Sequence, residues 1–287
     1  MKISNYLAKS NSKISLSKFS TEDTANIKSK VEGKELLDKN IQKMIELQDK
    51  LYASDKYSVL LIFQAMDAAG KDSIIKHVMS GLNPQGTQVY SFKQPSKEEV
   101  DHGFLWRIHK AAPERGRIGI FNRSHYEEVL VVKVHDLIKY QQLPEELIKE
   151  NIWDIRYEQI CDFEKYLYEN GTIVLKFFLH VSKDEQKQRF LDRIDDLSKN
   201  WKFSAADIKE RKHWDDYQKA YEEAIAATSK KQAPWYIIPA DKKWFARLLV
   251  SEIIVETLKN LNLDYPKLSV EQIAELQKCK ESLLAEK

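Results

Sequence analysis

The chain has little glycine, proline or cysteine, and it has no long apolar run. Only eight glycines and seven prolines occur in 287 residues, which argues against long irregular stretches and favours a helix-rich fold. The longest apolar runs, 57–66 and 129–134, are far shorter than the roughly 20 residues of a membrane span. Cys161 and Cys279 lie far apart and form no metal or redox motif, so we expect reduced thiols and a cytoplasmic protein without membrane contact.

Charge of one sign is also lacking. The sequence has 46 basic and 44 acidic residues, a net charge of +2, so we expect no nucleic-acid partner and only a local cluster for any polyanion. Residues 1–20 are basic and serine-rich but have no apolar signal-peptide core, although their composition also fits a transit peptide. The seven histidines show no zinc spacing, and neither G-x-S-x-G nor G-x-G-x-x-G occurs.

Short apolar runs alternate with longer amphipathic segments along most of the chain. The runs predict strands at 58–63, 87–92, 118–121, 172–180 and 235–239. The remaining periodic segments predict helices at 31–51, 71–80, 97–111, 124–134, 143–169, 182–197, 204–227, 243–261 and 269–284. This alternation predicts an α/β fold of three layers, with a parallel sheet between helices. We expect residues 1–54 to form an arm and a helix packed on a core of residues 55–287, which includes a lid at about 183–213 and C-terminal helices.

The first predicted strand continues into AMDAAGKD, residues 65–72. This resembles the phosphate-binding loop G-x-x-x-x-G-K-[ST], with Ala65 in place of the first glycine and Asp72 in place of Ser or Thr. Gly70 allows backbone N–H groups to turn inward, and Lys71 adds a positive charge at the phosphates. We therefore assign phosphate binding to Ala68, Ala69, Gly70 and Asp72 and catalysis to Lys71. The simpler alternative is an ordinary strand-to-helix turn capped by an aspartate.

Asp67 is an unusual residue inside such a loop. The loop lacks the hydroxyl that normally binds the metal, and phosphoryl transfer needs Mg²⁺ to offset developing charge. Asp67 is therefore the predicted metal ligand, with Mn²⁺ as an alternative ion. The alternative role for Asp67 is a hydrogen bond within its own turn.

A second polar group follows the third predicted strand, in RIGIFNRSHYEEVL (residues 117–130). Because ligands bind at the carboxyl edge of open α/β sheets, we expect Asn122, Arg123, Ser124 and Glu127 to face a cleft there. Arg117, at the start of this stretch, is included among the phosphate-binding candidates. The pattern is weak alone, because any strand followed by a polar helix start looks similar.

The stretch 183–212 is rich in basic residues on two predicted helices joined by a loop. Such an arrangement can form a lid over phosphates, with Arg189, Arg193 and Lys202 as the candidate contacts. Acidic residues are interleaved, so the alternative is a solvated helix face.

Three distant blocks, taken in order, resemble the polyphosphate kinase 2 family. They are FQAMDAAGKDSIIKHVMSGLNPQG (63–86), LWRIHKAAPERGRIGIFNRSHYEEVLVVKVH (105–135) and QRFLDRIDDLSKNWKFSAADIKERKHWDDY (188–217). The resemblance covers roughly 55–246 and leaves out the N-terminal arm and the last helix. It implies a thymidylate-kinase-like P-loop fold with a helical lid and Mg²⁺-dependent exchange of phosphoryl groups between polyphosphate and nucleotides.

Transferred residue by residue, the resemblance places its important positions on Asp67, Lys71, Asn122, Arg123 and the arginines at 189 and 193. Much of the family has Asp at position 122 and Asn at position 127, whereas this chain has Asn and Glu127. That pair resembles the subgroup that accepts both AMP and ADP. We therefore expect in-line transfer from inorganic polyphosphate to adenine nucleotides, with guanine as an alternative base, by a homo-oligomer.

Two other functions remain open from the residues alone. A nucleotide kinase that uses a nucleoside triphosphate as donor would need the same loop, lid and metal. A regulatory nucleotide-binding module would bind through Lys71 and consume no polyphosphate.

Overall fold

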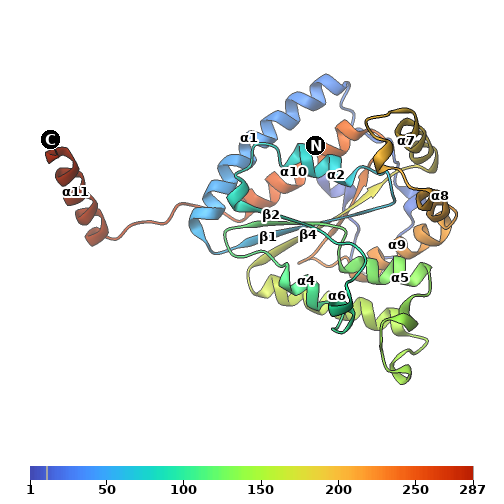
Figure 1. Cartoon of the computed structure of the whole chain (residues 1–287). Helices are drawn as coiled ribbons and strands as arrows, with labels where there is room; N and C mark the ends of the chain where they lie inside the picture. Colours follow the sequence, from blue (N-terminus) through green and yellow to red (C-terminus); the bar gives the residue numbers. More distant parts are fainter. Residues whose placement is uncertain (11, 287) are drawn as a thin grey trace.

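A five-stranded parallel sheet forms the centre of the molecule, in the order β2-β3-β1-β4-β5 (Figure 1). The computed structural model describes residues 1–10 and 12–286, and of Lys202 it describes the backbone alone. The strands are β1 (Ser58–Ala65), β2 (Thr87–Ser91), β3 (Ile118–Asn122), β4 (Thr172–His180) and β5 (Trp235–Pro239). The α/β prediction is confirmed.

The central strands are apolar because helices cover both of their faces. All eight residues of β1 are buried, as is typical of a strand inside a parallel sheet. Phe63 of β1 lies opposite Asn122 of β3, so the two strands end side by side. The polar residues that follow them therefore meet at one edge of the sheet.

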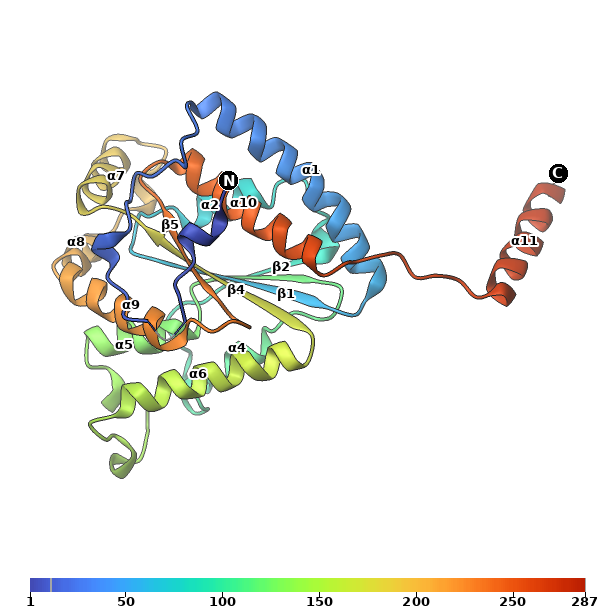
Figure 2. The same cartoon turned by 180° about the vertical axis from the view of Figure 1, so that it is seen from behind.

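Helices form one layer on each face of the sheet (Figures 1 and 2). One layer holds α1 (Lys30–Ser54), α2 (Lys71–Val78) and α10 (Lys243–Asn260). The other holds α4 (Trp106–Lys110), α5 (Val131–Val134), α6 (Ile152–Glu169) and α9 (Trp214–Thr228). The remaining helices are α3 (Lys97–Val100), α7 (Lys183–Asp195), α8 (Ala205–Arg211) and α11 (Val270–Ala285). Short 3₁₀ helices are η1 (Ile3–Tyr6), η2 (Leu16–Lys18), η3 (Pro84–Gly86), η4 (His125–Val129), η5 (Ile138–Tyr140), η6 (Glu145–Leu147) and η7 (Asn200–Lys202).

The segment before α1 packs on the core beside β5. Tyr6, Ala8 and Leu16 are buried, and the Ala8 N–H donates to the carbonyl of Trp235 at 2.9 Å. Leu7 also forms an isolated antiparallel bridge with Tyr236. These contacts extend the sheet edge at β5 by a short irregular segment.

Four of the predicted helices are wrong in extent, because each is interrupted. The segment 97–111 divides into α3 and α4 at a turn containing Gly103, and 143–169 becomes helical only from Ile152, after η6. The segment 124–134 begins as the 3₁₀ helix η4 rather than as α-helix. The segment 204–227 breaks at Lys212, because α9 buries one face against the core whereas α8 has no buried residue.

Within the described residues, no helix combines the length and the apolar composition needed to cross a bilayer.

Candidate active site

The cleft lies at the carboxyl edge of the sheet, where β1 and β3 end. The loop after β1, residues 66–70, leads into α2, and the Arg123 N–H after β3 donates to the carbonyl of Phe63 at 3.1 Å. Strand β1 has β3 on one side and β4 on the other, so the chain changes direction here across the sheet. Such a point leaves a crevice in which ligands bind in open α/β sheets.

The loop after β1 has the backbone conformation of a phosphate cradle. Gly70 has a φ of +109°, which side-chain-bearing residues rarely adopt, and Ala68 has a φ of +60°. The loop then passes into α2, whose N-terminus is a favourable place for an anion. The loop holds Ala68, Ala69 and Gly70 together at this point, beside Asp72 in the first turn of α2.

Lys71 lies beneath this loop and is almost fully buried. Its Nζ donates to the carbonyl of Ala65 at 2.9 Å. Burial, and secondarily the charge of Arg123, lower the pKa of Lys71, although Asp67, Glu127 and Asp72 act in the opposite direction. The amine is thus held at the base of the cleft, where any phosphate on the loop would become its counterion.

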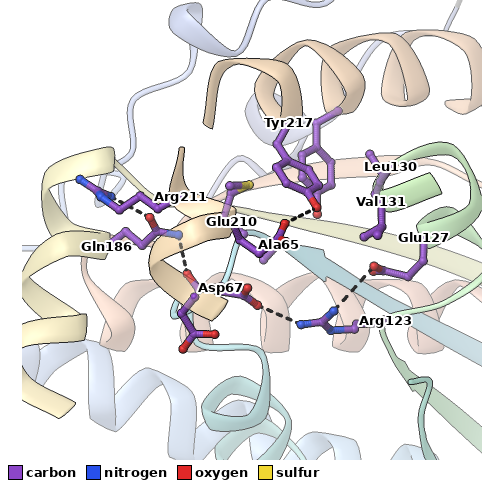
Figure 3. Close-up of a pocket in the computed structure, with 13 residues that line it drawn as sticks. Ala65, Asp67, Arg123, Glu127, Leu130, Val131, Gln186, Glu210, Arg211 and Tyr217 are labelled. Atoms are coloured by element: carbon purple, nitrogen blue, oxygen red, sulfur yellow. Dashed lines mark hydrogen bonds and ion pairs between the residues drawn. The ribbon is translucent and has the colours of Figure 1, made fainter. Parts of the chain in front are cut away.

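Arg123 stands between two carboxylates in the cleft (Figure 3). Its Nη2 is 2.9 Å from Oδ1 of Asp67, and its Nη1 is 3.7 Å from Oε2 of Glu127. Burial lowers the pKa of Arg123, but the carboxylates of Glu127 and Asp67 raise it above its ordinary value. Its φ of +64° is another departure from the usual backbone regions, as is common at functional sites.

Glu127 comes from η4, which a hydrogen-bonded start holds in place. The Ser124 hydroxyl accepts from the Tyr126 N–H at 3.2 Å and from Gln64 Nε2 at 3.1 Å. Burial raises the pKa of Glu127, while the charges of Arg123 and Lys71 lower it. Glu127 thus lines the same cleft as the loop. Burial has the larger effect on its pKa, which is raised.

Asn122 joins the two halves of the cleft. Its Nδ2 donates to Oδ1 of Asp72 at 2.6 Å, linking the end of β3 to the start of α2. Of the five residues predicted to be catalytic, Asp67, Arg123 and Glu127 line the cleft. Lys71 and Asn122 lie next to it, through their bonds to Ala65 and Asp72.

A buried polar network joins η4 to α6 and β4. Lys176 Nζ is 2.9 Å from the hydroxyl of Tyr126, which in turn donates to Glu164 Oε1 at 2.8 Å. Lys176 and Glu164 also form a buried ion pair, and Lys176 donates to the carbonyl of Thr228 at 2.8 Å. Since all these groups are satisfied, the network fixes Tyr126, the neighbour of Glu127.

The lid side of the cleft contains residues that the sequence analysis missed. They are Gln186, Asp207, Glu210, Arg211, Tyr217 and Tyr221. Gln186 Nε2 donates to the carbonyl of Asp67 at 2.9 Å and its Oε1 accepts from Arg211 at 2.7 Å, so α8 is tied to the loop through α7. In the sequence these residues look like ordinary polar positions on charged helices, so nothing in it indicates that they line the cleft.

Asp207 faces the loop from the lid. Burial, and next the carboxylate of Asp67, raise the pKa of Asp207. Arg193, on α7, lies 4.0 Å from Asp207 and is one quarter exposed. Asp67 on the loop and Asp207 on the lid therefore both line the cleft, and Arg193 lies beside Asp207.

Arg189 does not have the free guanidinium predicted for a phosphate contact. Its Nη1 donates to the carbonyls of Ala68 (3.1 Å) and Ala69 (2.7 Å), and its Nη2 to those of Ala240 (2.6 Å) and Asp241 (3.0 Å). Its Nε bonds Glu185. In this structure the buried side chain of Arg189 braces the phosphate loop, and a contact with phosphate stays a prediction.

One other predicted phosphate contact, Arg117, lies elsewhere. Arg117 precedes β3 and so lies at the amino edge of the sheet, where it stacks on Tyr52 and donates to the carbonyl of Gln85. It is separated from the cleft by the length of the strand, and we leave it out of the site. The side chain of Lys202 lies outside the described residues.

Asp67 has a donor set that fits Mg²⁺. One of its carboxylate oxygens accepts from Arg123, and the side chain is about one third exposed in the cleft. In the part of the chain that the structure describes, no group of three or more His, Cys, Asp or Glu residues could hold a metal. Mg²⁺ usually needs only one or two protein carboxylates when phosphates and water complete its shell.

Comparison with known proteins gives consistent matches over this fold. The model of the family "Polyphosphate kinase 2 (PPK2)" matches residues 27–266. An ADP-polyphosphate phosphotransferase of Rhodopseudomonas palustris is 51% identical over 274 residues, covering 95% of each chain. An AMP/ADP-polyphosphate phosphotransferase of Meiothermus ruber is 44% identical, over 91% of this chain and 95% of the relative. The crystal structure of polyphosphate kinase 2 from Arthrobacter aurescens TC1 is 41% identical, with a TM-score of 0.86 over 96% of this chain and 98% of that one.

Proposed function

Because the chain belongs to the polyphosphate kinase 2 family, we propose that it transfers phosphoryl groups from inorganic polyphosphate to both AMP and ADP. Polyphosphate-dependent phosphorylation of nucleotides is the activity of this family and of this chain. Acceptance of both acceptors, Mg²⁺ dependence and the individual residue roles are the finer parts of the proposal. Both cysteines are free thiols, and we infer a cytoplasmic enzyme.

The attacking group in this reaction needs little help to become a nucleophile. A nucleotide phosphate has a second pKa of about 6, by analogy with phosphate monoesters, and is largely ionised at neutral pH. The cleft therefore needs to position two polyanions in line and to offset their charge. Lys71 at the base and Arg123 at the wall supply that charge from the two sides of the loop.

The loop, α2 and Asp67 would hold the phosphates at the point of transfer. Gly70 and the start of α2 present backbone N–H groups, and Asp67 would hold Mg²⁺ together with phosphate oxygens. Bound there, the ion would neutralise charge on the transferring group. Arg193 would contact the polymer from the lid, beside Asp207.

The pair Asn122 and Glu127 is the observation that supports a dual acceptor. Glu127 lies 3.7 Å from Arg123 and so partly neutralises it, while Asn122 donates to Asp72 without adding a negative charge. Glu127 therefore gives Arg123 a negative partner even when the acceptor has no second phosphate. A site of this kind does not require the second phosphate, and AMP can bind as well as ADP.

The test is to exchange the two residues for those found in much of the family. Asn122→Asp places a carboxylate against Asp72, and Glu127→Asn frees Arg123 for a second phosphate. We expect the double variant to lower the AMP-to-ADP ratio of kcat/KM about tenfold or more, since charges this close interact by a few kcal/mol.

Both acceptors are measured with polyphosphate as the donor and no ATP. Wild-type turnover of one acceptor only would contradict the dual-acceptor proposal. An unchanged ratio in the double variant would instead return Asn122 and Glu127 to a purely structural role at the start of η4.

A further inference from the structure

The C-terminal helix α11 stands apart from the rest of the molecule in both views (Figures 1 and 2). Five apolar side chains on it are between 56% and 79% exposed: Val270, Ile273, Leu276, Leu283 and Leu284. Their spacing places them along one stripe of the helix. A capping box at Ser269 and Gln272 starts the helix, but an isolated helix of 16 residues is marginal in water and needs a partner for its apolar face.

Helix α11 cannot reach the α6 face of its own chain to find that partner. Tyr265, in the linker, donates to Asp49 of α1 at 2.5 Å, which holds the linker on the α1 side of the sheet. Four residues remain before α11, and they span at most about 14 Å. Two helix layers, each about 10 Å thick, and the sheet separate that point from the outer surface of α6.

That opposite face carries an apolar groove, which we call the α4–α6 groove. It encloses a cavity of about 720 Å³. Its apolar walls include Phe104, Leu105, Leu147, Ile155, Phe163 and Tyr166. Leu147 and Tyr166 are each 50% exposed, so the groove is open to a partner.

The apolar stripe of α11 carries a charged residue, and the α4–α6 groove carries one of the opposite sign. Lys280 lies inside the apolar stripe, four residues after Leu276 and four before Leu284. Asp162 lines the groove, and it has no ion-pair partner within the described part of the chain. A cation in the apolar stripe thus matches an unpaired carboxylate on the apolar groove.

We propose that two copies of this chain exchange their C-terminal helices. In this dimer α11 of each copy lies in the α4–α6 groove of the other, with Lys280 beside Asp162. A two-fold arrangement makes the same helix–groove contact twice, which doubles the surface buried by one short helix. The family model ends at residue 266, so α11 lies outside the part of the chain that it matches, whereas the groove lies within it.

The test measures the dimer dissociation constant of the full-length protein by sedimentation over a range of concentrations. Ile273→Glu puts a carboxylate into the proposed contact and should raise the dissociation constant about tenfold or more. Ser282→Glu adds the same charge to the opposite face of α11 and should leave it unchanged.

The pair is tested by charge exchange. Lys280→Asp and Asp162→Lys should each weaken the dimer. An equal mixture of the two variant chains should recover affinity, because both helix–groove contacts of the mixed dimer then pair a cation with a carboxylate. A wild-type chain that stays monomeric, equal effects of Ile273→Glu and Ser282→Glu, or no recovery in the mixture would overturn the proposal. None of these readouts depends on phosphotransfer.

Discussion

At the scale of single residues, Arg123 keeps two carboxylates of the cleft apart. Asp67 and Glu127 contact different nitrogens of its guanidinium, and the backbone at Arg123 is strained to place it there. Each carboxylate is thus partly neutralised before any substrate enters. The two carboxylates differ in their surroundings. The side chain of Asp67 is open to the cleft, whereas burial raises the pKa of Glu127.

Asp67→Asn should weaken the response to Mg²⁺ more than nucleotide binding. The variant keeps the shape of the side chain but loses the charge that would hold the ion, so we expect the Mg²⁺ midpoint to rise about tenfold, or about 1.4 kcal/mol. Asp101→Asn, an exposed acid on the α3 side, is the control. An unchanged midpoint would leave Asp67 with only the role of holding Arg123.

Glu127→Gln should change stability in a pH-dependent way. Burial raises the pKa of Glu127, so the folded chain binds this proton more tightly than the unfolded chain does. The stabilising contribution is complete below the unfolded pKa and is lost as pH rises through the folded pKa. We expect the Tm of Glu127→Gln to exceed that of wild type by a few degrees at about pH 8, and by less at about pH 5.

Glu98→Gln, an exposed acid on α3, should show no such trend. A Tm difference for Glu127→Gln that is the same at both pH values would show that its ionisation is not linked to folding.

At the scale of elements, α7 positions the phosphate loop through one arginine. Arg189 donates to two loop carbonyls and to two carbonyls after β5. Gln186, one turn earlier on α7, holds the Asp67 carbonyl. The loop conformation, with its positive φ at Ala68 and Gly70, is thus set by contacts more than 110 residues away in the sequence.

Alanine substitutions of Arg189 and Arg193 should therefore affect different properties, the first folding stability and the second polyphosphate binding. Arg189→Ala leaves buried carbonyls without donors and should cost about 2–5 kcal/mol of folding stability, seen as a lower Tm. Arg193→Ala, one turn further on α7, should keep the wild-type Tm and raise the KM for polyphosphate. A wild-type Tm for Arg189→Ala with only a change in KM would contradict the bracing role.

The strands and the loop were predictable from sequence because their signals are local. Continuous apolar runs mark the strands, and the sequence AMDAAGKD marks the loop. The direction of β3 also shows that Arg117, which precedes the strand, belongs at the opposite edge. That inference was open to the sequence and was missed.

The role of Arg189 could not be predicted in the same way. An arginine on a charged helix looks the same in sequence whether its partners are phosphates or distant carbonyls. The break between α8 and α9 is similar, because it depends on which residues find a core to pack against. The cleft residues Gln186, Asp207 and Glu210 come together only when α7 and α8 fold over the loop.

At the scale of the whole molecule, the fold places the charged groups of the cleft at the carboxyl edge of one sheet. The strands are buried between two helix layers (Figure 1). The cleft is lined by residues that follow the carboxyl ends of β1 and β3. On the proposed function, one cleft serves both acceptors, so ADP made from AMP can return to the same place and become ATP. The two steps should share every group that handles phosphate.

The most direct measurement is a time course with AMP as the sole nucleotide, polyphosphate as the sole donor, Mg²⁺ and no ATP. We expect ADP to appear first and ATP after a lag, while polyphosphate is consumed. Lys71→Ala should reduce both steps about 100-fold or more, because one group that stabilises transition-state charge contributes about 3 kcal/mol. Lys76→Ala, an exposed lysine on the same helix, should change neither. Consumption of polyphosphate without nucleotide products, or loss of only one step in Lys71→Ala, would contradict transfer to both acceptors in this cleft.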